Sequence, residues 1–191
     1  MKRLFIGIPI FSEQVIQFTN SCQKDELLNR YVIKWTNPFN WHITLIFLGQ
    51  TPESKLDVLQ KYMESSFTGI PSFNAELRGI GIFPNSNNPK VLWLGLDHLN
   101  PLISAQRNMV ELLQQNGFNL ENKPLKPHLT LARVKNSASR MAIVSLIDQY
   151  KSFDFGTVTF DRVILYESIS TPSGPEYKPL FAKELSSSYC N

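Results

Sequence analysis

The sequence has little cysteine and a modest share of charged residues. Only two of its 191 residues are cysteines, Cys22 and Cys190, which excludes a disulfide-stapled scaffold and a four-cysteine zinc site. We expect two free thiols in a reducing compartment. Charged residues make up 18% of the chain and hydrophobic residues 42%, whereas a disordered chain is richer in charge and poorer in apolar groups.

The sequence also lacks a long apolar run. Lys2-Arg3 precede the apolar segment 4–11, but Gly7 and Pro9 interrupt it, so this segment is typical of a strand and not of a signal peptide. No run reaches the roughly 18 apolar residues of a membrane-spanning helix. We expect a cytoplasmic protein with no membrane partner. The net charge of +3 permits an anionic ligand without requiring one.

Strand-like and helix-like segments alternate along the chain. Apolar, β-rich runs predict single strands over 4–8, 41–48, 91–96 and 128–134. The segment 73–83 predicts one or two strands and 155–166 predicts two, with 177–185 as a candidate last strand. Capping residues and helical spacing predict helices from Ser12 to about 31, from 52 to beyond 63, from 100 to about 113 and from Ser137 to about 151. Met141, Val144, Leu146 and Ile147 are expected on the apolar side of the last helix, and 84–89 reads as a loop.

This order of elements occurs twice. Each half, roughly 1–90 and 91–191, reads strand, helix, strand, helix, strands. The tetrapeptide 42–45, His-Ile-Thr-Leu, recurs 86 residues later as His-Leu-Thr-Leu at 128–131. We therefore interpret the chain, 1–191, as one domain made of two related lobes that pack about a pseudo-twofold axis, which would bring equivalent residues face to face.

Each repeated segment places an imidazole and a hydroxyl on one side of a strand, because residues i and i+2 share a face. His42 with Thr44, and His128 with Thr130, are then expected to converge in one cleft. A neutral imidazole can take a proton from water, and an imidazolium can give one to a leaving alkoxide. The hydroxyls suit phosphoryl oxygens, and Arg133 suits them as well if it lies at the cleft rim rather than on the outer surface.

The remaining candidates receive structural interpretations. His98 stands outside any such motif and is expected in a loop. Strand alternation places Trp41 and Phe47 opposite His42, which predicts core positions and not base stacking. Two histidines without a third His or Cys at suitable spacing do not predict a zinc site, and neither cysteine has the surroundings of a nucleophile.

The paired motifs resemble those of the 2H phosphoesterase superfamily, and more closely those of RNA 2′,3′-cyclic phosphodiesterases, historically called 2′-5′ RNA ligases. The resemblance extends over nearly the whole chain, in segments 3–6, 40–49, 81–84, 91–95 and 126–133. It implies an α+β, bilobal, pseudo-twofold fold with two antiparallel sheets and outer helices around a central cleft. It also implies hydrolysis of RNA or nucleoside 2′,3′-cyclic phosphates to 2′-phosphomonoesters, with no metal and no other cofactor.

The same resemblance assigns roles to residues. His42 is the proton donor toward the 3′-oxygen, His128 is the proton acceptor toward water, and Thr44, Thr130 and Arg133 bind the phosphate. Pseudo-symmetry leaves the reverse assignment of the histidines open. The expected partners are RNA ends or small cyclic nucleotides, and the chain is expected to be a monomer. The alternatives are 2′-5′ RNA ligase or phosphodiesterase activity, and an RNA-end binding module with little turnover, against which the intact histidine pair argues.

One segment departs from the family pattern. Family members often have Tyr-Ser-x-Leu in the last repeat strand, where this chain reads Tyr166-Glu167-Ser168-Ile169, with Tyr177 farther on. Glu167 is either a surface change or a change in how a nucleic-acid end approaches the cleft.

Overall fold

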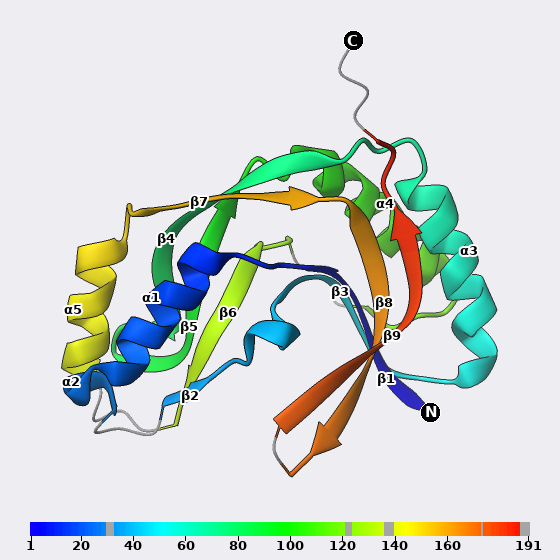
Figure 1. Cartoon of the computed structure of the whole chain (residues 1–191). Coiled ribbons are helices and arrows are strands. Elements are labelled where there is room, and N and C mark those ends of the chain that lie inside the picture. Colours follow the sequence, from blue (N-terminus) through cyan, green and yellow to red (C-terminus); the bar gives the residue numbers. More distant parts are fainter. Residues whose placement is uncertain (30–32, 121–123, 136–139, 173, 188–191) are drawn as a thin grey trace.

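The computed structural model describes residues 1–29, 33–120, 124–135, 140–172 and 174–187, and it confirms the expected α+β class (Figure 1). The strands are β1 (Lys2–Pro9), β2 (Ile33–Trp35), β3 (His42–Thr51), β4 (Phe73–Asn85), β5 (Asn88–Asp97), β6 (His128–Val134), β7 (Asp154–Phe160), β8 (Arg162–Thr171) and β9 (Gly174–Glu184). The α-helices are α1 (Glu13–Lys24), α2 (Glu26–Asn29), α3 (Leu56–Phe67), α4 (Asn100–Gln115) and α5 (Arg140–Tyr150), with short 3₁₀ turns η1 (Pro38–Asn40) and η2 (Glu53–Lys55).

The described strands form one curled sheet in the order β7-β4-β5-β6-β3-β1-β8-β9, with β2 beside β6. Neighbouring strands run antiparallel throughout. The sheet has two wings, a first lobe of β1, β3, β8 and β9 and a second lobe of β2 and β4–β7. The two wings meet where Ile43 of β3 pairs with Leu129 of β6. The two expected antiparallel sheets are thus joined at the centre of the repeated motifs.

The lobes exchange strands along the chain. The second half of the sequence supplies β8 and β9 to the first lobe, and the first half supplies β2 and β4 to the second. The helices follow this division, since α3 and α4 pack on each other and on first-lobe strands, while α1 and α5 contact β7 and β4. Figure 1 shows the sheet arching between these two helix pairs. Within the described residues, no helix is long and apolar enough to cross a membrane.

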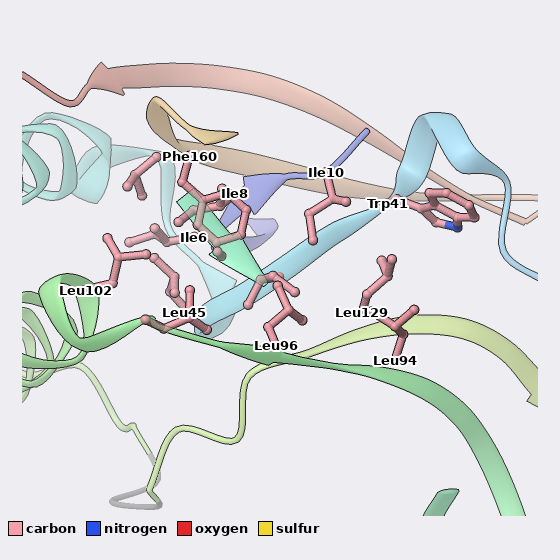
Figure 2. Close-up of a cluster of buried hydrophobic side chains, with 14 of the residues drawn as sticks. Ile6, Ile8, Ile10, Trp41, Leu45, Leu94, Leu96, Leu102, Leu129 and Phe160 are labelled. Carbon is pink, nitrogen blue, oxygen red and sulfur yellow. The ribbon is translucent and has the colours of Figure 1, made fainter. Parts of the chain in front are cut away.

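A single buried cluster underlies both lobes. Figure 2 shows side chains of β1 and β3, such as Ile6 and Leu45, beside Leu94 of β5 and Leu129 of β6. Trp41, just before β3, is buried among them, as the alternation predicted. Apolar burial of this kind is the main favourable contribution to folding, so the core holds the two motif strands together from behind.

Most expected elements are confirmed, but the first helix and the segment 84–89 differ from expectation. Ser12 caps α1 by accepting from the Val15 amide at 3.3 Å, but the expected single helix is interrupted at Asp25, where α1 ends and after which α2 begins. The predicted loop 84–89 is wrong, because β4 and β5 continue to a tight hairpin in which the Asn85 side chain accepts from the amides of residues 87 and 88. The predicted cap Ser137 lies outside the described residues.

The predicted burial of Met141 is also wrong. Met141 is 85% exposed, whereas Ile143 is fully buried and defines the inner face of α5. Two residues correspond to about 200° of helical rotation, so Met141 lies on nearly the opposite side of the helix from Ile143.

The seam between the lobes should be a sensitive point for stability. We expect Ile43→Ala and Leu129→Ala each to lower the free energy of unfolding by about 2–5 kcal/mol, because both side chains are buried where the lobes meet. Met141→Ala, on an exposed helix face, is the control and should change it by less than about 0.5 kcal/mol. Urea denaturation measures all three. A seam variant as stable as the control would show that the pairing does not hold the lobes together.

Candidate active site

The strands β3 and β6 each carry a β-bulge directly after the motif threonine. In β3, Gly7 pairs with Thr44 but the next partner pair is Ile6 with Ile46, so Leu45 is an extra residue. A bulge breaks the alternation of faces. Leu45 and Ile46 are both buried, and Phe47 returns to the side of Thr44 with 54% exposure. The prediction that Phe47 belongs to the core is therefore wrong.

The bulge in β6 repeats the one in β3. Trp93 pairs with Thr130 and Leu92 with Ala132, which leaves Leu131 as the extra residue. Leu131 and Ala132 are both buried, and Arg133 comes onto the face of Thr130. Strict alternation would have placed Arg133 on the opposite face. The bulge thus places Arg133 at the cleft and not on the outer surface, the two positions between which the sequence did not decide.

The predicted site residues lie together. A cavity of about 580 Å³ lies over the seam, within the size range of small-molecule sites. It is lined by all five predicted site residues, His42, Thr44, His128, Thr130 and Arg133, and also by Arg3, Phe5, Lys34, Trp35, Thr36, Asn37, Asn40, Phe47, Ser168, Gly174, Pro175, Glu176 and Tyr177. Basic side chains outnumber the acidic one, Glu176, so the lining favours an anionic ligand.

Both imidazoles are held in the same way. Nδ1 of His42 lies 2.7 Å from the Asn40 carbonyl oxygen, and Nδ1 of His128 lies 2.7 Å from the Lys126 carbonyl oxygen. A carbonyl can only accept a hydrogen bond, so each Nδ1 carries the proton and donates. Each neutral ring then keeps Nε2 as its free basic atom. Fixing one ring nitrogen in this manner determines the atom that exchanges protons with a ligand.

The surroundings of the two imidazoles differ. The ring of His42 packs 4.7 Å from Phe5 and 4.9 Å from Tyr177, centroid to centroid. Among the described ring contacts, His128 meets only Phe83, at 5.1 Å. Burial lowers the pKa of His42, the Asn40 hydrogen bond partly offsets this, and the nearby charge of His128 lowers it further. The charge of His128 is therefore close enough to act on the ring of His42.

Arg3 and Tyr177 line the cavity although the sequence interpretation gave them no role there. Arg3 lies over the ring of Phe47, with its guanidinium carbon 5.3 Å from the ring centroid. Burial raises the pKa of the Tyr177 hydroxyl, while the charges of Arg133 and Arg3 oppose that shift, so Tyr177 stands near both guanidiniums. Arg3 lies two residues before Phe5 on the same strand, so alternation alone indicates that both face the cavity. The positions of Tyr177 and Phe47 at the cavity depend on how their strands pair with neighbouring strands, which the sequence pattern does not give.

The departure at Glu167 does not reach the cavity. Its carboxylate accepts from the Lys2 ammonium at 2.8 Å, and neither residue lines the cavity. Strand alternation sends Glu167 to the face opposite its neighbour Ser168, which does line it. Glu167 is accordingly a change outside the cavity.

The other singled-out residues have no part in the cavity. His98 lies in the loop between β5 and α4, as expected, with Nε2 3.4 Å from a Glu76 carboxylate oxygen. Cys22 is a free, buried thiol whose pKa burial raises to about 12, which makes it a poor nucleophile, and Cys190 lies outside the described residues. Within the described ranges, no three His, Cys, Asp or Glu side chains gather as metal ligands.

The two-lobed sheet and the paired His-x-Thr motifs are features of a 2H phosphoesterase, and comparison with known families agrees. The chain belongs to the family described as the AKAP7 2'5' RNA ligase-like domain, which matches residues 4–182. The resemblance to 2H phosphoesterases is thereby confirmed. Two relatives named RNA 2',3'-cyclic phosphodiesterase are similar over most of their length. The one from Archaeoglobus fulgidus is 36% identical, covering 93% of this chain and 97% of its own, and the one from Thermotoga maritima is 32% identical, covering 94% and 93%.

Solved structures support the same fold. The structure of TT0787 from Thermus thermophilus superposes with a TM-score of 0.78 at 29% identity, covering 98% of this chain and all of the other. E. coli LigT complexed with 3'-AMP superposes with a TM-score of 0.76, covering 96% of this chain and 98% of its own, at 23% identity. The expected fold is thus confirmed.

The asymmetry between the imidazoles should be measurable in the unliganded protein. We expect His42 to titrate below the ordinary histidine pKa of about 6.5. His128→Asn should raise the pKa of His42 only part of the way back, because it removes a charge but leaves the larger effect of burial. Imidazole chemical shifts followed by NMR against pH measure both values. A His42 pKa at or above about 6.5 in the wild type would contradict the asymmetry.

Proposed function

We propose that this chain is a phosphoric diester hydrolase that opens 2′,3′-cyclic phosphates at RNA ends or on small nucleotides and leaves 2′-phosphomonoesters. The observation that carries the proposal is the convergence of two His–Thr pairs, with both imidazoles anchored through Nδ1, in one basic cavity. The relatives named RNA 2',3'-cyclic phosphodiesterase support it. A pure binding site would have no need of two imidazoles with matched tautomers.

The reaction uses the two basic nitrogens in opposite directions. A water oxygen bonds to phosphorus while the bond from phosphorus to the 3′-oxygen breaks. Nε2 of His128 accepts the proton of the water, and protonated His42 gives its proton to the departing 3′-oxygen. The product carries a 2′-phosphate and a 3′-hydroxyl. His128 ends protonated and His42 neutral, and exchange with solvent restores both. Each proton transfer by a placed side chain contributes about 10²–10⁴ in rate.

Thr44, Thr130 and Arg133 bind the phosphate during this exchange. The antiparallel register centred on Ile43 and Leu129 sets each threonine across from the histidine of the other motif. The two hydroxyls can therefore donate to phosphoryl oxygens from both sides. The guanidinium of Arg133 adds a charged donor with the geometry of two phosphate oxygens.

The lowered pKa of His42 agrees with a role as acid once an anion is bound. A lowered pKa makes imidazolium a stronger acid, but it leaves less of it protonated near neutral pH. A bound phosphodiester places a negative charge beside the ring and favours the protonated form again. Binding of the substrate would thus favour the protonated form of His42, which is the form that acts as the acid.

The remaining predictions concern the whole protein. We infer that the chain acts as a monomer. A cytoplasmic location and a reaction without a metal stay predictions as well. Activity retained after exhaustive chelation would support the latter, whereas loss on chelation and recovery with zinc would overturn it.

The two histidines should be distinguishable by leaving group. We expect His42→Ala and His128→Ala each to lower kcat for a 2′,3′-cyclic nucleotide by about 10²–10⁴. A phosphodiester that releases 4-nitrophenolate needs no acid, so His42→Ala should retain most activity on it while His128→Ala should not. Steady-state kinetics with both substrates, on variants shown to be folded by circular dichroism, measures this.

The outcomes separate the assignments. Rescue of His128→Ala instead of His42→Ala would reverse the two roles. A folded histidine variant with more than about a tenth of wild-type kcat would remove that residue from the mechanism. Chromatography of the product tests the reaction itself, since a 3′-phosphate would contradict cleavage of the bond to the 3′-oxygen.

Arg133 should contribute mainly to substrate binding. Loss of a hydrogen bond to a charged group costs about 1.5–3 kcal/mol, so Arg133→Ala should lower kcat/KM by roughly 10- to 150-fold, chiefly through KM. Arg107, exposed on α4 and outside the cavity, provides the control Arg107→Ala, which should match the wild type. A loss confined to kcat would place Arg133 on the charge that develops in the transition state, and no loss would exclude it from the site.

A further inference from the structure

Two basic residues lie directly opposite each other at one end of the cavity. In the antiparallel ladder between β2 and β6, Lys34 pairs with Arg133. Residues paired in this way have side chains on the same face, and like charges in such positions destabilise a sheet. Both side chains are exposed and both line the cavity. Two cationic side chains at paired positions on the cavity face favour an anionic ligand there.

The backbone holds this arrangement in place. The Thr36 amide, two residues after Lys34, donates to the Leu131 carbonyl oxygen at 2.9 Å, which fixes β2 against the bulge of β6. From there the chain continues along the cavity through Asn37 and Asn40 to His42. One polar wall therefore runs from Lys34 to the catalytic histidine, as a wall contacting a nucleic-acid backbone would.

The two cationic heads differ in position. The charge of Arg133 acts on Tyr177, whose ring is edge-on to His42, so its guanidinium belongs to the histidine side of the cavity. The ammonium of Lys34 reaches the β8–β9 hairpin instead, where a Cβ added to Gly174 would lie 3.1 Å from Nζ. This places Lys34 at the rim.

The strand geometry gives the spacing between the two positions. Because Leu131 is the extra residue of the bulge, the partners of Thr130 and Arg133 on β5 are only two residues apart, which is about 7 Å at the rise of an extended strand. From this shared position Arg133 extends toward Tyr177 and the histidines, whereas Lys34 extends toward Gly174 in the hairpin. The ammonium of Lys34 is therefore suitably placed for the next phosphate of a polynucleotide.

We propose that Lys34 binds the phosphodiester one nucleotide before the cyclic end, so that the enzyme acts preferentially on RNA of two or more nucleotides and less well on a cyclic mononucleotide. This inference rests on the proposed function and names the substrate class of the same site. Arg133 binds the reacting phosphate, and Lys34 binds the phosphodiester that is present only when another nucleotide precedes the cyclic end.

The test compares 2′,3′-cyclic AMP with an adenylyl dinucleotide that has the same cyclic end, a 5′-hydroxyl and a single internucleotide phosphodiester. We expect the wild type to favour the dinucleotide in kcat/KM. Lys34→Gln should lower kcat/KM for the dinucleotide about tenfold, mainly through KM, with a much smaller loss on the mononucleotide. Lys34→Arg should keep most of the preference. Lys90→Gln, which removes the same charge from an exposed position on β5 outside the cavity, should change neither.

A neutral linkage isolates the contact. A dinucleotide in which a methylphosphonate replaces the internucleotide phosphodiester should lose the advantage in the wild type and should be insensitive to Lys34→Gln. Equal kcat/KM of the wild type for mononucleotide and dinucleotide, or equal losses on both in folded Lys34→Gln, would overturn the inference and leave the proposed function intact. A wild type that turns over neither substrate would overturn the proposed function itself.

Discussion

The pairing of Ile43 with Leu129 is the contact on which the rest of this molecule depends. These two residues occupy the middle of the two His-x-Thr motifs, and they join the lobes into one sheet. Because the strands run antiparallel, the pairing sets each histidine across from the threonine of the other motif. The side chains of both residues are buried in the shared core, where Figure 2 shows Leu129. One core contact therefore determines both the union of the lobes and the convergence of the site.

The twin bulges turn this symmetric frame into a site with two different ends. They bring Phe47 and Arg133, each five residues after its histidine, onto the cavity face. At the β6 end the bulge presents a guanidinium beside Lys34. At the β3 end it presents an aromatic ring covered by Arg3. A substrate that is charged at one end and planar at the other, as a nucleotide is, matches this polarity better than inorganic phosphate does.

Sequence reasoning succeeded where the determining interactions are local. Alternation within five residues predicts that His42 and Thr44 share a face, and the recurrence of the tetrapeptide predicts their partners. The bulges could not be predicted, because they exist only relative to the neighbouring strands β1 and β5. For this reason the sequence pattern places Phe47 in the core and does not decide whether Arg133 lies at the cleft or on the outer surface. The exchange of β8 and β9 into the first lobe likewise depends on long-range pairing that no local pattern encodes.

The proposed reaction requires that the two histidines differ, since two identical groups in a symmetric site would have no preferred direction of proton transfer. The backbone does not separate them, because each imidazole has the same anchor on a carbonyl two residues earlier. The difference comes from the β8–β9 hairpin. Asn40, whose carbonyl anchors His42, also donates from its side chain to the Pro175 carbonyl at 2.8 Å, and this hairpin brings Tyr177 against His42. Aromatic enclosure removes water from the imidazole of His42 and thereby lowers its pKa. In the proposed reaction, this difference between the two histidines is what sets the direction of proton transfer.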